Sequence, residues 1–175
     1  TMKMRKLEYQ LRFLTPAFLG NAEQRAQWRT PPLKALLRQW WRVAYAADKR
    51  FAVRVDEMRH EEGLLFGHAW LEGDTFERNG KSITTAARKS EIRLRLSSWA
   101  AGKLTSWQGL EQGAVHHPET EKTGNKVGPH AYLGFGPLDG RGGTKLSKTN
   151  AAIQAGESAT LSLAFPEQHA PRIEH

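Results

Sequence analysis

The chain contains no cysteine, and this absence excludes several classes of protein chemistry. Without a thiol there is no disulfide framework, no thiolate zinc or iron–sulfur site and no cysteine nucleophile. Long hydrophobic runs are also lacking, because no stretch approaches the ~20 apolar residues that cross a bilayer, and no apolar signal core follows the basic N-terminus. No phosphate-loop motif is present. The composition therefore predicts a soluble, cytoplasmic protein.

What the chain does have is enough apolar material for one core and an uneven distribution of charge. Of its 175 residues 39% are hydrophobic, which predicts a single domain over residues 1–175. The net charge is +8, and the first 60 residues hold 13 of the 26 Lys and Arg but 5 of the 18 Asp and Glu. Clustered cations favour a polyanionic partner, because each phosphate they neutralise releases a counterion. The alternative is a solvated basic face that only maintains solubility.

Three segments alternate between apolar and polar residues as half-buried strands do. The first covers residues 4–13 and stops before Thr15-Pro16, and the second begins around Arg88 and runs to about residue 98. The second strand is expected to have a partner before the turn signal Asn79-Gly80. The third covers residues 159–165 and ends at Pro166. Their inward residues are expected to be Leu7, Tyr9, Leu11, Phe13, Ile92, Leu94, Leu96, Leu161, Leu163 and Phe165.

The strongest helix signal covers residues 31–47, with Thr30 as N-cap and two prolines in the first turn. Helical spacing predicts that an apolar side faces the core, with Trp40 buried and Trp41 bordering a basic face. The apolar side comprises Leu33, Leu36, Leu37, Trp40 and Ala44, and the basic face comprises Lys34, Arg38 and Arg42 beside Trp41 and Tyr45.

Two further segments follow this helix in the prediction. A short helix is expected from 56 to 66, ending at Gly67, with the carboxylates of EMRHEE facing solvent. The stretch 109–150 is rich in Gly, Pro, Thr and His without a sustained period, which predicts an irregular loop or insertion.

The order strand, basic helix, strands, loop, strand predicts an α+β, ferredoxin-like (RRM-like) fold. Its antiparallel sheet would carry helices on one face and would be incomplete at the C-terminus. In this interpretation the helix N-terminus and its cations hold phosphates, while Trp28, Trp41 and Tyr45 stack unpaired bases. The candidate RNA-binding residues are Arg29, Lys34, Arg38, Trp41, Arg42, Tyr45, Arg93 and Arg95.

Three ordered blocks resemble the RAMP superfamily of CRISPR proteins, and within it the family of subunit one of the type III-B Cmr effector complex. They are the turn Leu14–Ala22 (LTPAFLGNA), the helix Arg29–Arg42 (RTPPLKALLRQWWR) and the segment Glu61–Gly67 (EEGLLFG). The later YLGFGPL, 132–138, extends the similarity. Two features depart from the family pattern. Ala35 replaces the usual Gly, and the Gly-rich loop that follows the last helix in the family is expected to be absent because the chain ends first. The Gly-rich stretch LDGRGGTKL precedes a strand and is a poor substitute.

The resemblance implies a RAMP domain in a non-catalytic subunit that binds CRISPR RNA or target RNA near the 3′ end of the guide. Neighbouring RAMP subunits are the implied protein partners, and no cofactor, metal or membrane is implied. One alternative is a metal-independent CRISPR RNA-processing endoribonuclease, using His116, His117, His130 or Tyr132 with Lys122 or Lys126. Another is a purely structural assembly module that grips neighbours through exposed aromatics and the 109–150 segment. A metal site lacks a third ligand beside His60 and His68.

Overall fold

The computed structural model describes residues 3–107, 128–134, 136–140 and 144–174, and its fold is mixed α and β. Backbone contacts divide the chain into two compact units. Unit 1 combines Thr1–Tyr9, Thr30–Arg95 and Leu161–His175, and unit 2 combines Gln10–Arg29 and Leu96–Thr160. Each is described by itself below, and the single RAMP domain stays a prediction.

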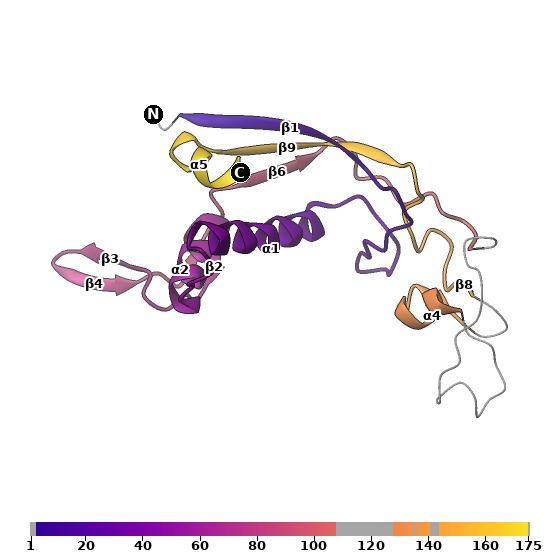
Figure 1. The fold of residues 1–175 in the computed structure, drawn as a ribbon, viewed down its shortest axis with the longest axis horizontal. Coiled ribbons are helices and arrows are strands. Elements are labelled where there is room, and N and C mark those ends of the chain that lie inside the picture. Colours follow the sequence, from indigo (N-terminus) through magenta and orange to yellow (C-terminus); the bar gives the residue numbers. More distant parts are fainter. Residues whose placement is uncertain (1–2, 108–127, 135, 141–143, 175) are drawn as a thin grey trace, which may run out of the picture. The chain divides into compact units, whose positions relative to one another are not determined.

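Three strands form the main sheet, in the order β1-β9-β6 (Figure 1). They are β1 (Met4–Arg12), β6 (Arg93–Leu96) and β9 (Ser158–Pro166). Backbone bonds join Lys3 to Glu167 at one end and Phe13 to Glu157 at the other, so β1 and β9 run antiparallel. Every second residue of β9 is buried, namely Ala159, Leu161, Leu163 and Phe165. The alternation predicted for residues 159–165 is thereby confirmed.

Strands β1 and β6 match their sequence patterns less completely. On β6 and the residue before it, Ile92 and Leu96 are buried while Arg93 and Arg95 are exposed, as predicted. On β1, Leu7 and Leu11 are half-buried, but Tyr9 is exposed and its prediction as an inward residue is wrong. The second predicted strand is also split, because residues 89–92 lie between β5 (Ala87–Arg88) and β6.

The two helices of unit 1 are α1 (Thr30–Asp48) and α2 (Val55–Phe66), within one residue of the predicted bounds. Both prolines of α1 lie in its first turn, where a missing backbone N–H costs no hydrogen bond. Helix α2 ends at Gly67, which has a positive φ of 83°. The rings of Trp41 and Phe66 lie edge to face at 6.1 Å and join the two helices.

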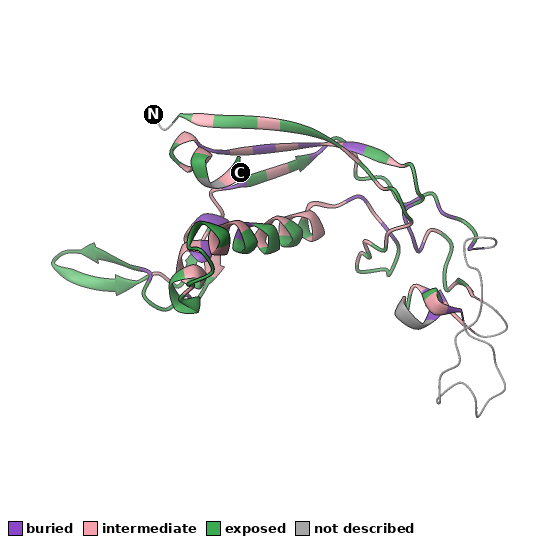
Figure 2. Cartoon of the chain, in the orientation of Figure 1, coloured by how far each residue is buried: buried purple, intermediate pink, exposed green. Residues whose placement is uncertain are grey.

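The buried side of α1 differs in part from the prediction, and Figure 2 shows the helix mostly half-buried or exposed. Leu33, Leu37 and Ala44 of the predicted apolar side are half-buried, but Leu36 and Trp40 are exposed. Trp40 is 69% exposed and Trp41 only 8%. Leu36 and Val43 share the exposed side with Trp40. The prediction that Trp40 and Leu36 are buried while Trp41 borders the surface is therefore wrong. The reason lies in α2, which packs on the side of α1 that carries Trp41 and buries it against Phe66.

A two-stranded extension follows α2. It consists of two antiparallel strand pairs. The inner pair, which we call the inner rung, is β2 (His68–Ala69) with β5, and the outer pair, which we call the outer rung, is β3 (Thr75–Arg78) with β4 (Lys81–Thr84). The turn between β3 and β4 is Asn79-Gly80, with φ values of 52° and 68° that suit a type I′ hairpin. The strand directly before Asn79-Gly80 is β3, and it pairs with β4. Only β5, at the start of the predicted strand, has a partner from before this turn, namely β2, whereas β6 pairs with β9.

After β9 the chain continues into a 3₁₀ turn (Glu167–His169) and the short α5 (Ala170–Ile173). Unit 2 contains the short elements α4 (Pro129–Leu133), β7 (Leu138–Asp139) and β8 (Lys145–Leu146), around a cluster of Leu104, Trp107, Leu138 and Ala152. Residues 109–127, 135 and 141–143 of the predicted loop lie outside the described residues. Among the described helices, none has the length and apolar character needed to cross a membrane.

Candidate nucleic-acid interface

The basic face of α1 is turned onto α2. Lys34 Nζ donates a hydrogen bond of 2.7 Å to the carbonyl oxygen of Phe66, the last residue of α2. The final carbonyls of a helix have no partner within the helix and carry partial negative charge, so a cation there is favourable. Burial, together with the charge of Arg38, lowers the pKa of Lys34. Lys34 therefore anchors α1 to the end of α2, and its ammonium is already engaged.

Glu62 of α2 holds the other two cations of this face. Arg38 Nε donates to Glu62 Oε1 at 2.5 Å, and Arg42 donates to both carboxylate oxygens, at 2.7 and 2.9 Å. Glu62 is buried, so the prediction that the EMRHEE carboxylates face solvent is wrong for this residue. A buried carboxylate requires such partners, because the loss of hydration costs several kcal/mol, about 20 in the Born limit.

The pKa values follow from this arrangement. Burial raises the pKa of Glu62, but hydrogen bonds from Arg42 and Arg38 outweigh burial, and the net direction is downward. The same hydrogen bond raises the pKa of Arg42. Glu62 therefore remains ionised around neutral pH, and its carboxylate fixes both guanidiniums.

The two guanidiniums line a cavity of about 330 Å³ between α1, α2 and β2. We call it the arginine pocket, defined by Arg38, Arg42, Arg59, Glu62 and His68. Three guanidiniums meet one carboxylate there, which leaves an excess of positive charge. Each guanidinium has five N–H donors, of which Arg38 gives one and Arg42 two to Glu62. Their side chains are 39% and 46% exposed, so the remaining donors can reach a ligand.

Arg59 completes the pocket and was not among the residues predicted from the sequence. It lies on α2, is exposed, and makes no hydrogen bond or ion pair within the described part of the chain. Its spacing of three residues from Glu62 places both on one side of the helix. The sequence shows this spacing, but it does not show that α2 packs on the basic face of α1, which is what places Arg59 beside Arg38 and Arg42.

The aromatic residues predicted to stack on bases are largely inside the protein. Trp41 is buried, with its ring 5.1 Å from that of the half-buried Tyr45. Trp28, in unit 2, is buried beside Phe13 and donates from its indole N–H to Glu157 at 3.2 Å. Trp28 and Trp41 are therefore core residues in this structure, and neither ring is exposed for a base to stack on.

The remaining predicted RNA-binding residues lie elsewhere. Arg93 and Arg95 are exposed on β6, on the side of the strand opposite Leu94 and Leu96. Arg29 belongs to unit 2, where Nη1 donates to the carbonyl oxygen of Gly20 at 2.5 Å. Of the eight predicted residues, Arg38 and Arg42 line one pocket. Lys34 and Trp41 contact Phe66 at the end of α2, and Tyr45 packs beside Trp41.

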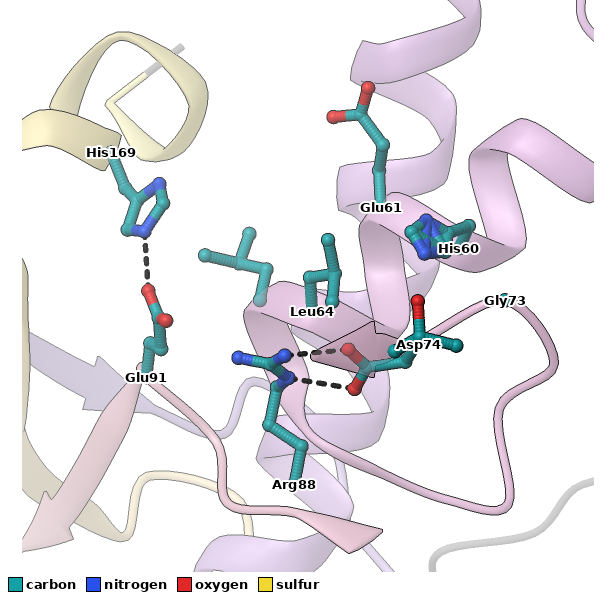
Figure 3. Close-up of a pocket in the computed structure, with 10 residues that line it drawn as sticks. His60, Glu61, Leu64, Gly73, Asp74, Arg88, Glu91 and His169 are labelled. Atoms are coloured by element: carbon teal, nitrogen blue, oxygen red, sulfur yellow. Dashed lines mark hydrogen bonds and ion pairs between the residues drawn. The ribbon is translucent and has the colours of Figure 1, made fainter. Parts of the chain in front are cut away.

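A second cavity, of about 380 Å³, lies in unit 1 beside α2, at the base of the two-stranded extension (Figure 3). Asp74 is buried there and accepts hydrogen bonds from Arg88 at 2.9 and 2.6 Å. The Nε2 atom of His68 lies 2.5 Å from the same carboxylate. The hydrogen bond from Arg88 lowers the pKa of Asp74 to about 2, with His68 contributing and burial opposing. On another wall, His169 Nε2 lies 2.5 Å from Glu91 Oε2.

Most of the residues named for a nuclease fall where the structure gives no description. His116, His117, Lys122 and Lys126 lie outside the described residues, and His130 is exposed with its ring edge-on to Trp107. Across the described ranges, no three side chains of the metal-binding types come together around a possible ion.

Comparison with known proteins gives no neighbour. No family model, no curated protein and no solved structure matches the chain.

Proposed function

We propose that the chain is a non-catalytic RNA-binding subunit of a CRISPR effector complex of type III-B. Its arginine pocket would hold the phosphate backbone of CRISPR RNA or target RNA. The convergence of Arg38, Arg42 and Arg59 on one partly exposed pocket is the observation that carries this proposal. Guanidinium groups bind phosphate through paired N–H donors, and fixing them in advance reduces the entropy lost on binding.

The order of the strands supports the ferredoxin-like part of the proposal. The sheet order β1-β9-β6 places the third long strand of the chain between the first and second, with α1 connecting the first two. A βαββαβ unit has this arrangement for its first three strands. The described chain would correspond to the first βαββ portion of such a unit, with α2 and the two-stranded extension inserted between the first helix and second strand.

The experiment that tests the proposal is a salt titration of RNA binding with Arg59→Ala. Arg59 is the best choice because its side chain makes no hydrogen bond or ion pair with the other described residues. Removing Arg38 or Arg42, in contrast, would leave the buried Glu62 with fewer hydrogen-bond partners. The variant should bind single-stranded RNA about three- to tenfold more weakly and lower the salt slope by about 1. Arg25→Ala removes the same charge from an exposed position in unit 2 and serves as the control.

Two results would contradict the proposal. In the first, the unaltered protein does not bind RNA at physiological salt. In the second, Arg59→Ala and Arg25→Ala lower the affinity and the slope equally, which would mean that net charge matters and the pocket does not.

A further inference from the structure

The two-stranded extension of residues 68–88, which we call the β-arm, has an outer rung that is not packed against the rest of unit 1. All eight residues of β3 and β4 are exposed, and Figure 1 shows the hairpin projecting away from α1 and α2. A two-stranded hairpin without a third strand or a covering helix is only marginally stable in water. The outer rung therefore adds little to the core of unit 1, and its surfaces are open to a partner.

The two faces of the outer rung differ in character. The register pairs Phe76 with Ile83 and Arg78 with Lys81, and residues two apart on a strand point to the same face. One face therefore carries an apolar pair, with Phe76 47% and Ile83 37% exposed, next to a pair of cations. The opposite face carries Thr75, Glu77, Ser82 and Thr84. We call the first the arm face.

The cation pair is costly to the hairpin by itself. Like charges directly opposite each other on paired strands are destabilising, and the only carboxylate of the outer rung, Glu77, belongs to the other face. Within the described part of the chain, neither Arg78 nor Lys81 has a hydrogen bond or ion pair to an acidic group. A bound anion would convert this repulsion into attraction.

An anion alone would not account for the aromatic ring beside the two cations. A phosphate next to a flat base is the combination that single-stranded nucleic acid offers, and base stacking on an aromatic side chain is largely independent of sequence. A protein partner would need acidic side chains spaced to match, and no observation on the arm specifies such spacing. Charge and ring together therefore favour a nucleic acid.

The base of the arm is held firmly enough to present this face. Asp74 is buried at the start of the outer rung and receives two hydrogen bonds from Arg88 of β5, with His68 of β2 against the same carboxylate. Figure 3 shows the paired bonds between Arg88 and Asp74. Together with His68 they tie the two strands together where these leave α2. A binding element that leaves a fixed base loses less conformational entropy when it binds.

We infer that the arm face is a second contact surface for single-stranded RNA, with a base stacked on Phe76 and a phosphate between Arg78 and Lys81. This inference rests on the proposed RNA-binding function, and it assigns the β-arm a part in it that is separate from the arginine pocket. Ile83 lies directly opposite Phe76 in the register of the hairpin.

The test measures binding of labelled oligouridine to the full chain carrying Phe76→Ala or the double change Arg78→Ser and Lys81→Ser. Phe76→Ala should weaken binding about five- to tenfold, the lower part of the range for one stacked base. The double change should lower the salt slope by about 1. Thr84→Ala, on the opposite face, is the control and should leave affinity unchanged. Phe76→Tyr should restore binding, because it keeps the aromatic ring.

The outcomes separate this inference from the proposed function. If Arg59→Ala weakens binding while all the arm variants bind as the unaltered protein does, the arm inference alone is overturned. Absence of RNA binding by the unaltered protein overturns both. Two further outcomes would show that the RNA inference is wrong. If the arm variants bind RNA normally but aggregate, the arm face serves to prevent strand pairing between molecules. If they bind RNA normally but lose binding to an acidic polypeptide such as polyglutamate, the arm face binds a protein. Phe76→Ala with weak binding that Phe76→Tyr fails to restore would also count against stacking.

Discussion

Arg42 donates hydrogen bonds to both oxygens of the Glu62 carboxylate, from Nε at 2.7 Å and from Nη2 at 2.9 Å. This paired geometry fixes the plane of the guanidinium. Arg38 shares the same carboxylate, so one acidic side chain of α2 positions two basic side chains of α1. The orientation of both guanidiniums in the arginine pocket thus depends on Glu62, which does not itself attract an anion.

Replacing Glu62 by Gln should separate stability from charge. The change leaves two guanidiniums beside a neutral amide, and we expect the free energy of unfolding to fall by about 2 kcal/mol, less than for a fully buried pair because the arginines are partly hydrated. RNA affinity should fall although the protein becomes more positive, because the guanidiniums lose their fixed orientation. Urea unfolding and RNA titration measure the two effects.

Glu57→Gln is the matched control for this experiment, because it makes the same change at an exposed position of the same helix. It should leave stability within about 0.5 kcal/mol. Tighter RNA binding by Glu62→Gln than by Glu57→Gln would show that Glu62 only repels the ligand and does not position the arginines.

The β-arm should lose stability in acid through Asp74. Its pKa is about 2 in the folded chain, against 3.8 for an ordinary aspartate. A depressed carboxyl pKa stabilises the fold fully above the unfolded value, and this contribution is lost as the pH falls from about 4 towards about 2. Urea midpoints measured at pH 5 and at pH 2.5 should therefore differ less for Asp74→Asn than for the unaltered protein.

The Asp74→Asn protein should also be less stable at pH 7, by about 2 kcal/mol, because Arg88 loses a charged acceptor. Asp48→Asn, at the exposed end of α1, is the control and should keep the full pH dependence. An identical pH dependence in the unaltered and Asp74→Asn proteins would contradict the assigned role of the Asp74 carboxylate.

Adjacent positions on α1 show what the sequence could and could not predict. The bounds of α1, α2 and β9 were predictable because caps, prolines and alternation act locally. Which side of α1 is buried was not predictable, because the choice depends on where α2 packs. From the sequence, the charged face was expected to face solvent. In the structure Glu62 pairs with Arg38 and Arg42, and the Phe66 carbonyl accepts a hydrogen bond from Lys34, so α2 can pack against part of that face.

The same reasoning applies to the candidate site. Arg38 and Arg42 were identified from their spacing along α1. Arg59 and Glu62 belong to α2, and the spacing of residues on α1 does not predict where α2 packs. The arm face needed the strand register, because only the pairing of Phe76 with Ile83 shows which cations share its side. Long-range packing therefore supplied the part of the site that local patterns lacked.

Substitution of the two neighbouring tryptophans should reproduce their difference in burial. Trp41→Ala should lower the free energy of unfolding by about 3–5 kcal/mol, since it opens a cavity between α1 and α2. Trp40→Ala should change it by about 0.5 kcal/mol, as for other exposed positions. Urea unfolding followed by circular dichroism measures both. A larger loss for Trp40 than for Trp41 would mean that the predicted orientation of α1 was correct after all.

Gly67 connects the arginine pocket to the β-arm, and its replacement by alanine should disturb both. Its φ is 83°, and a Cβ there would lie 2.7 Å from both the Arg88 carbonyl oxygen and the Ser90 nitrogen. Gly73 has nearly the same φ, 82°, but its Cβ would meet nothing within 4 Å. Gly73→Ala should therefore cost only the backbone strain, about 1 kcal/mol.

Gly67→Ala should cost at least about 2 kcal/mol, because backbone atoms of β5 and the residues after it must also move. Its RNA affinity should fall more than that of Gly73→Ala, because Gly67 lies between Phe66, which Lys34 holds, and His68, which contacts Asp74. Equal losses of stability in the two variants, measured by urea unfolding, would show that strain alone accounts for Gly67. Backbone contact with β5 would then have no part in fixing the arm.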